Sequence, residues 1–193
     1  MRVLIACEFS GKVRDAMRER GHDAVSCDLL PSERSGPHIQ GDVLTVLDQG
    51  WDLLIAHPSC TYLCNSGVRW LYGGKGRQLD PVRWAQMEAA CEFFNMIWRS
   101  EIPKIAIENP TPHRYATDRI GDYTQAIHPW QFGHDETKRT CLWLKNLPRL
   151  QPTKIVPGRI PRVHHASPGP DRWKERSRTL TGIAQAMAEQ WGC

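Results

Sequence analysis

Short apolar runs alternate with amphipathic segments along the first half of this chain. The runs Arg2–Cys7, His22–Cys27 and Asp52–Ala56 have the length and composition of strands buried on both faces. Between the first two, apolar residues recur at helical spacing until Gly21, a residue type that commonly ends a helix. This order of strand, helix and strand predicts an α/β protein with a mostly parallel sheet.

The clearest helix start is Asp80-Pro81, where the aspartate can cap the helix and the proline suits its first turn. The apolar positions that follow are three or four residues apart, which predicts one stripe that packs against the sheet. The chain then returns to the sheet in a second long apolar run, Lys104–Ile107. The residues of the stripe are Trp84, Met87, Cys91, Phe94 and Trp98.

In two segments the apolar residues show neither helical nor strand spacing. Leu30–Gln40 is rich in proline, serine and glycine and predicts a surface loop, after which Gly41-Asp42 leads into a short helix. Cys60–Asp80 contains four glycines and several basic residues, and we expect a long loop there. Such a loop either closes as a lid over an anionic substrate or is simply a surface loop.

The last third of the chain changes pattern. Thr124–Phe132 and Thr140–Leu144 predict strands joined through residues 133–136, which favours an antiparallel edge on the sheet. Thr181–Trp191 predicts a closing helix. The expected fold class is therefore α/β, with a Rossmann-like, doubly wound, mostly parallel sheet and an antiparallel C-terminal edge.

The length of 193 residues suits one domain, 1–193, without room for a large recognition domain. A formal net charge of +4 is compatible with an anionic partner but does not require one. The proline-rich segment 148–178 carries much of the basic charge and includes Trp173. It could bind the phosphates of a nucleotide or of DNA, with the tryptophan stacked on a base, or it could be a solvated connector.

Composition also bears on location and on metals. No stretch approaches the roughly 20 apolar residues of a membrane span, and no signal-peptide pattern is present, so we expect a cytoplasmic protein. Seven scattered cysteines indicate reduced thiols. Cys60 and Cys64 have a spacing that zinc could use, but no second pair accompanies them, and we expect no metal.

Two motifs carry candidate chemistry. Cys60 follows one apolar run, and Glu108-Asn109 follows another. Because open parallel sheets bind ligands beyond the carboxyl ends of their strands, we expect the thiol and the carboxyl group to share one site. A thiolate can add to C6 of a pyrimidine while a carboxyl group bound to the ring nitrogen stabilises the developing charge. Alternatively, Cys60 is a small buried residue and Glu108 only closes a strand.

Pro58-Ser59-Cys60 and Glu108-Asn109-Pro110 resemble the Pro-Pro-Cys and Glu-Asn-Val motifs of the cytosine-C5 DNA methyltransferases. The likeness is closer to small phage and prophage members that lack the large target recognition domain, with the basic segment 148–178 in its place. It implies a methyltransferase fold and a reaction on a base flipped out of DNA. By the same resemblance, Cys60 adds to C6, Glu108 binds N3 and the exocyclic group, Asn109 orients the loop and Arg139 steadies the base.

The resemblance also implies S-adenosylmethionine as the cofactor. Its binding residues would be Glu8, Phe9, Ser10, Gly11, Asp28, Asp42 and Pro58. Asp28 corresponds to the residue that holds the ribose hydroxyls and Asp42 to the one that faces the adenine, while Gly182-Ile183-Ala184 corresponds to the closing helix. The first loop keeps a single glycine and Ser59 replaces a proline, so a different donor stays open.

Other functions remain open at this point. The substrate could be a free pyrimidine nucleotide instead of DNA, or the chain could be a non-catalytic DNA-binding or host-interaction protein on the same fold. An amino-methyltransferase is disfavoured, because His57-Pro58-Ser59-Cys60 lacks the acidic or amide residue and the aromatic residue of that motif.

Overall fold

A mixed sheet forms the centre of the computed structural model, which describes residues 1–73, 78–162, 169 and 172–192. Within these residues the main sheet has seven strands in the order β3-β2-β1-β4-β7-β9-β8. The strands are β1 (Arg2–Ala6), β2 (Asp23–Asp28), β3 (His38–Gln40), β4 (Leu53–Ala56), β7 (Lys104–Pro110), β8 (Gln125–Ile127) and β9 (Thr140–Lys145).

The strand directions confirm the predicted fold class. The five strands from β3 to β7 are parallel. β9 is antiparallel to both of its neighbours, so β8 at the edge points the same way as β7. Side chains of β1 and β4 are buried on both faces, which explains why their sequences read as continuous apolar runs.

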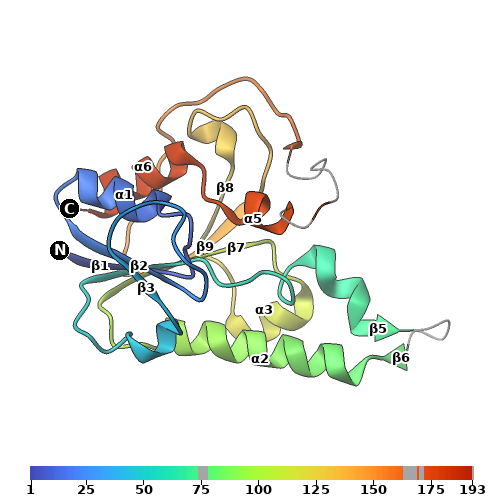
Figure 1. Cartoon of the computed structure of the whole chain (residues 1–193). Helices are drawn as coiled ribbons and strands as arrows, with labels where there is room; N and C mark the ends of the chain where they lie inside the picture. The colour runs from blue at the N-terminus through green and yellow to red at the C-terminus, as the bar shows by residue number, and fades with distance from the viewer. Residues whose placement is uncertain (74–77, 163–168, 170–171, 193) are drawn as a thin grey trace.

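Helices cover both faces of the sheet (Figure 1). α1 (Lys12–Glu19) and α6 (Thr181–Trp191) pack on one face with Val3 and Ile5. α2 (Pro81–Trp98) and α3 (Arg114–Ile120) pack on the other with Leu4 and Ala6. Alternate residues of β1 therefore enter different cores, as the period of a strand requires.

The helices with the clearest sequence signals were predicted correctly. α2 begins at Pro81, and the Asp80 side chain accepts a hydrogen bond from the backbone N–H of Arg83 at 2.9 Å. The centre of its predicted stripe is buried. α6 has the predicted bounds, and Val43–Thr45 forms the expected short helix as the 3-10 turn η1. Among the described residues, no helix combines the length and apolar character needed to cross a bilayer.

Three segment predictions were wrong in part. The loop at 30–40 ends in β3, because His38–Gln40 pairs with the end of β2. The strand predicted over Thr124–Phe132 is only Gln125–Ile127, since Pro129 has no N–H for a ladder and starts the 3-10 helix η3 (Pro129–Gln131). The frequent prolines of the basic segment argue against regular structure, but it contains a helix, α5 (Arg172–Ser177).

The segment after Cys60 is not a structureless loop. It forms a 3-10 helix, η2 (Asn65–Leu71), and the short antiparallel pair β5 (Tyr72–Gly73) and β6 (Gln78–Leu79). Leu71 is buried in the core between α2 and the sheet, and this contact anchors the segment. Its predicted lid residues 74–77 lie outside the described residues.

A buried cation fastens α1 to the loop between β2 and β3. The Arg14 side chain is fully buried, and its NH2 lies 2.8 Å from the Asp15 carboxylate. Four further groups accept hydrogen bonds from its guanidinium: the hydroxyls of Ser26 and Ser32 and the carbonyls of Arg34 and Ser35.

Replacing Arg14 by methionine is expected to lower the free energy of unfolding by about 3 kcal/mol, because Asp15 and two carbonyls lose their buried partner. Urea unfolding followed by circular dichroism measures the change. Arg20→Met is the control, since the Arg20–Glu189 pair is about half exposed and contributes at most about 1 kcal/mol. Equal loss in both variants would contradict a special role for Arg14.

Candidate functional site

The two predicted motifs lie level with each other on neighbouring strands. β4 and β7 are parallel with Ala56 paired to Ile107, so His57 and Glu108 are the next residues on each. The sequence placed Glu108 and Asn109 after the strand. They are instead inside β7, because this strand continues through Pro110 along β9.

Two hydrogen bonds join the loop after β4 to β7. His57 Nδ1 donates to Glu108 Oε2 across 3.1 Å, and Asn109 Nδ2 donates to the carbonyl of Pro58 across 2.9 Å. The side chains of His57 and Glu108 are only 6% and 14% exposed. His57 Nε2 and Asn109 Oδ1 are buried without a partner among the described residues. The site therefore holds polar atoms available to a ligand.

Glu108 is held in its ionised form. Burial alone would raise its pKa, but the hydrogen bond from His57 and the positive charge of Lys138 together bring the pKa below its usual range. Glu108 consequently carries a negative charge at neutral pH.

Cys60 lies in the turn that follows, half-buried, where the N–H of Cys64 donates to its carbonyl at 3.1 Å. The hydrogen bond from its thiol to the Cys64 sulfur, burial and the charge of Glu108 raise the pKa of Cys60, and the charge of Lys138 opposes them. Hydrogen bonds from Cys60 and Ser66 lower the pKa of Cys64. The charge of Glu108 thus acts on Cys60.

Lys138, two residues before β9, is the cation whose charge acts on both Cys60 and Glu108. The NH2 of the predicted Arg139 donates to the Tyr123 hydroxyl at 2.6 Å, and its guanidinium lies 5.7 Å from that ring's centre. Its charge also acts on Cys141, which pairs with Asn109 across β7 and β9.

The loop after β1 holds the predicted cofactor residues Glu8, Phe9, Ser10 and Gly11. The buried Glu8 carboxylate accepts hydrogen bonds from the Val13 N–H at 2.8 Å and from the Ser10 hydroxyl at 3.0 Å. Glu8 therefore caps α1, and the part of its carboxylate that faces a ligand is limited.

Phe9 is buried against the basic segment: its ring centre lies 6.1 Å from that of the half-exposed Trp173 of α5. Gly11 has a φ of +69°, and a Cβ there would meet Arg14 at 2.5 Å. This glycine is needed both for its backbone conformation and for its contact with the buried arginine.

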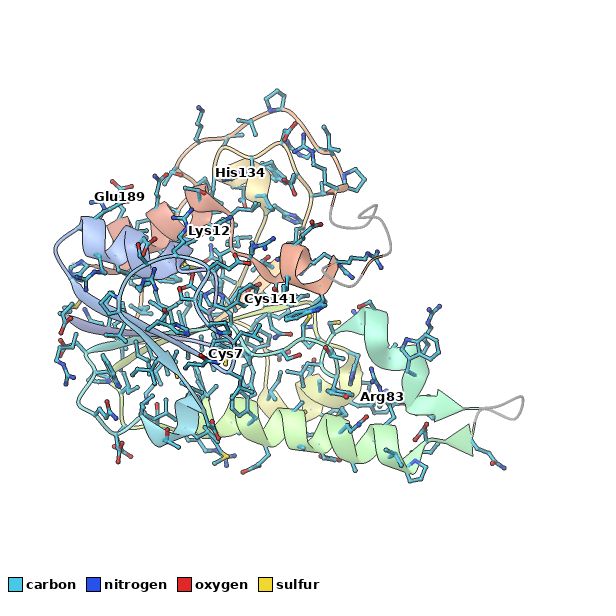
Figure 2. All side chains as sticks on the ribbon, in the orientation of Figure 1. Cys7, Lys12, Arg83, His134, Cys141 and Glu189 are labelled. Atoms are coloured by element: carbon cyan, nitrogen blue, oxygen red, sulfur yellow. The ribbon has the colours of Figure 1, made fainter. Side chains whose placement is uncertain are left out.

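Asp28 and Asp42 gather around Cys7 at the same end of the sheet. Asp28 accepts a hydrogen bond from the Leu30 N–H at 2.9 Å, and Asp42 from the Leu44 N–H at 3.0 Å. Burial, followed by the charges of Asp28 and Asp42, raises the pKa of Cys7 to about 12. Cys7 is thus a neutral thiol, and Figure 2 places it between the two helical layers.

Comparisons with known proteins bear on the fold. No protein-family model and no curated protein matches the chain. A candidate DNA modification methyltransferase encoded within an E. coli prophage superimposes with a TM-score of 0.51 at 13% identity, over 87% of this chain and 55% of that one. The chain has this methyltransferase fold.

A second solved structure, a mutant of Spodoptera frugiperda DNMT2, superimposes with a TM-score of 0.43 at 13% identity, over 83% of this chain and 54% of that one. The chain thus spans about half the length of the structures that it matches.

On the methyltransferase fold, the residues present suit S-adenosylmethionine at its nucleoside end. An acidic residue after the second strand, about 20 residues beyond a glycine loop, is placed to bind ribose hydroxyls. Asp28 occupies that place, half-buried, with burial raising its pKa and only one of its oxygens holding the Leu30 N–H. The carbonyl of Pro58, also predicted for the cofactor, accepts the hydrogen bond from Asn109.

Sequence reasoning missed two residues of this site, His57 and Lys138. The sequence contained a signal for each: His57 directly follows a buried strand, and Lys138 is adjacent to the predicted Arg139. For the zinc alternative, the described residues contain no group of three or more His, Cys, Asp or Glu side chains arranged to hold a metal.

Proposed function

We propose that this protein is an S-adenosylmethionine-dependent methyltransferase that acts at C5 of cytosine in DNA through a covalent adduct on Cys60. The observation that carries the proposal is the pair of hydrogen bonds, His57 to Glu108 and Asn109 to the Pro58 carbonyl, that ties the loop bearing Cys60 to the strand bearing Glu108. The fold is compatible with this reaction but does not by itself establish it.

In this mechanism the thiolate of Cys60 attacks C6 of the ring. The Cys64 thiolate accepts the proton of the Cys60 thiol as the Cys60 sulfur adds to the ring, and the charge of Lys138 favours the negative charge that develops on Cys60. The new S–C6 bond transfers electron density into the ring, which makes C5 nucleophilic and N3 basic.

Glu108 supports that charge shift. Its carboxylate accepts a hydrogen bond from the exocyclic amine and faces N3, which takes up a proton from water as the sulfur adds, so the attraction is strongest in the transition state. His57 fixes the carboxylate, and Asn109 fixes the loop that carries Cys60.

When bound, S-adenosylmethionine supplies an electrophilic methyl group to C5. Asp28 would hold its ribose, and the loop from Cys7 to Gly11 would lie beside it. After methyl transfer, a water molecule takes the C5 proton, the S–C6 bond breaks and N3 releases its added proton. The expelled Cys60 sulfur then takes its proton back from Cys64.

An oligonucleotide containing 5-fluorocytosine tests the proposal. In the presence of S-adenosylmethionine we expect a covalent complex that survives denaturing electrophoresis, because fluorine at C5 cannot leave as a proton does. Mass spectrometry of the digested complex should place the adduct on Cys60. An adduct with 5-fluorodeoxycytidine monophosphate alone would move the substrate to a free nucleotide. Absence of any adduct and of any methyl transfer would contradict the proposal.

A further inference from the structure

A pocket adjoins the proposed reaction centre and belongs to none of the roles assigned above. It lies where α5 approaches the start of β9 (Figure 1), and the Lys138 Nζ donates to the carbonyl of Arg176 at 3.0 Å. We call it the cationic pocket. Its lining is Glu136, Lys138, Arg162, Glu175, Arg176, Arg178 and Leu180.

Two of the four lining cations already have carboxylate partners. Arg162 binds Asp135 in a bidentate pair and lies 3.4 Å from Glu136, and Arg178 binds Glu33 through two hydrogen bonds at 2.6 and 2.9 Å. These pairs hold α5 and its neighbours in place. They leave Lys138 and Arg176 as the cations that can serve a ligand.

The side chain of Arg176 also indicates a ligand in this pocket. Its Nε is buried and has no hydrogen-bond partner among the described residues. A buried N–H without a partner is costly, and a guanidinium is best satisfied by a group that offers two oxygens side by side. Phosphate and carboxylate are such groups.

The surrounding charge adds to this preference. Glu33 lies in the field of Lys12 and Lys174 as well as its partner Arg178. Burial and the repulsion from Arg34 and Arg178 lower the pKa of Lys12. The lining itself has four cations, Lys138, Arg162, Arg176 and Arg178, against two carboxylates, Glu136 and Glu175, so positive charge is in excess there.

Lys138 connects the pocket to the reaction centre, because its charge acts on Cys60 and Glu108 while it also lines the pocket. In a nucleotide, the phosphate is separated from the base by one sugar. A ligand that places its base between Cys60 and Glu108 would bring its phosphate toward this side.

We propose that the cationic pocket binds the 5′-phosphate of the nucleotide whose pyrimidine reacts, with Arg176 and Lys138 as its ligands. The identity of the base rests on the proposed function. Phosphate binding does not require methyl transfer and can be measured without it.

The test compares charged and uncharged phosphate positions by calorimetry. One arm uses deoxycytidine and its 5′-monophosphate. The other uses a short single-stranded oligonucleotide with either a phosphodiester or a neutral methylphosphonate 5′ to the target cytosine. For the wild-type protein we expect the charged member of at least one pair to bind about tenfold more tightly. The arm that responds identifies the source of the phosphate.

Arg176→Gln should remove this preference. Arg114→Gln, the same change at an arginine that is 89% exposed on α3, should keep it. Arg176→Lys retains the positive charge but lacks the paired N–H donors of the guanidinium, so it should lose part of the preference for the charged phosphate. It provides the test if the glutamine variant does not fold. Equal binding of both members in both arms, or a full preference in Arg176→Gln, would overturn the proposal.

Failure of the pocket and failure of the proposed function have different outcomes. A phosphate preference without any 5-fluorocytosine adduct would leave the pocket standing and remove the catalytic assignment. An adduct that forms equally well with the methylphosphonate oligonucleotide would leave the catalytic assignment standing and remove the role of the pocket in phosphate binding.

Discussion

Cys60→Ser is expected to abolish adduct formation and to reduce kcat/KM for methyl transfer by at least about 10⁴-fold. A serine hydroxyl holds its proton far more tightly than a thiol, and neither Lys138 nor Cys64 can ionise it at neutral pH. Transfer of labelled methyl groups to DNA, followed over time, measures the loss. Affinity for the oligonucleotide should change little, because the substitution keeps the side chain nearly the same size.

Cys64→Ser distinguishes the two thiols of this turn. The variant keeps the proposed nucleophile and should still form the adduct, more slowly, since a serine hydroxyl cannot accept the Cys60 proton as the Cys64 thiolate does. An adduct that persists in Cys60→Ser and disappears in Cys64→Ser would transfer the nucleophilic role to Cys64. Comparison of thermal unfolding checks that both variants fold.

Glu108→Gln should lower the single-turnover rate about 10³-fold. A neutral amide cannot offset the positive charge that develops at N3, and its NH₂ group would meet the hydrogen that His57 now donates. Rapid-quench measurement at saturating DNA isolates the chemical step from binding. Glu92→Gln, an exposed position on α2, is the matched control, and equal rates in the two variants would contradict the role of Glu108.

The stability that Glu108 contributes to the wild-type fold should also depend on pH. Because the pKa of Glu108 is lower in the folded chain than its usual value, the carboxylate stabilises the fold above that usual value. This contribution is lost as the pH falls through the folded pKa. The difference in unfolding free energy between wild type and Glu108→Gln should therefore shrink toward acid pH, and a difference that grows would contradict an ionised Glu108.

Local signals in the sequence were enough for much of the fold. A strand buried on both faces needs apolar residues throughout, and Leu53–Ala56 shows this directly. The cap at Asp80 also acts within one turn of chain. α5 could not be predicted in this way, because its position depends on distant partners, Phe9 for Trp173 and Glu33 for Arg178.

The site was predicted less completely for a similar reason. The positions of Cys60 and Glu108 after apolar runs were visible in the sequence, and parallel strands bring such ends together. Whether Lys138 or Arg139 faces them depends on which way the chain enters β9, and the contact of His57 with Glu108 depends on the register of β4 and β7. Register is a property of pairing between segments, not of either segment alone.

The place of β9 in the sheet has a consequence for how the molecule assembles. β8 precedes β9 in the chain but reaches the sheet only through it, so β8 must wait until β9 has docked on β7. Such non-local pairing is slow compared with helix formation. Since Lys138 enters with β9, a refolding chain should regain most of its helical signal before it regains a competent nucleophile.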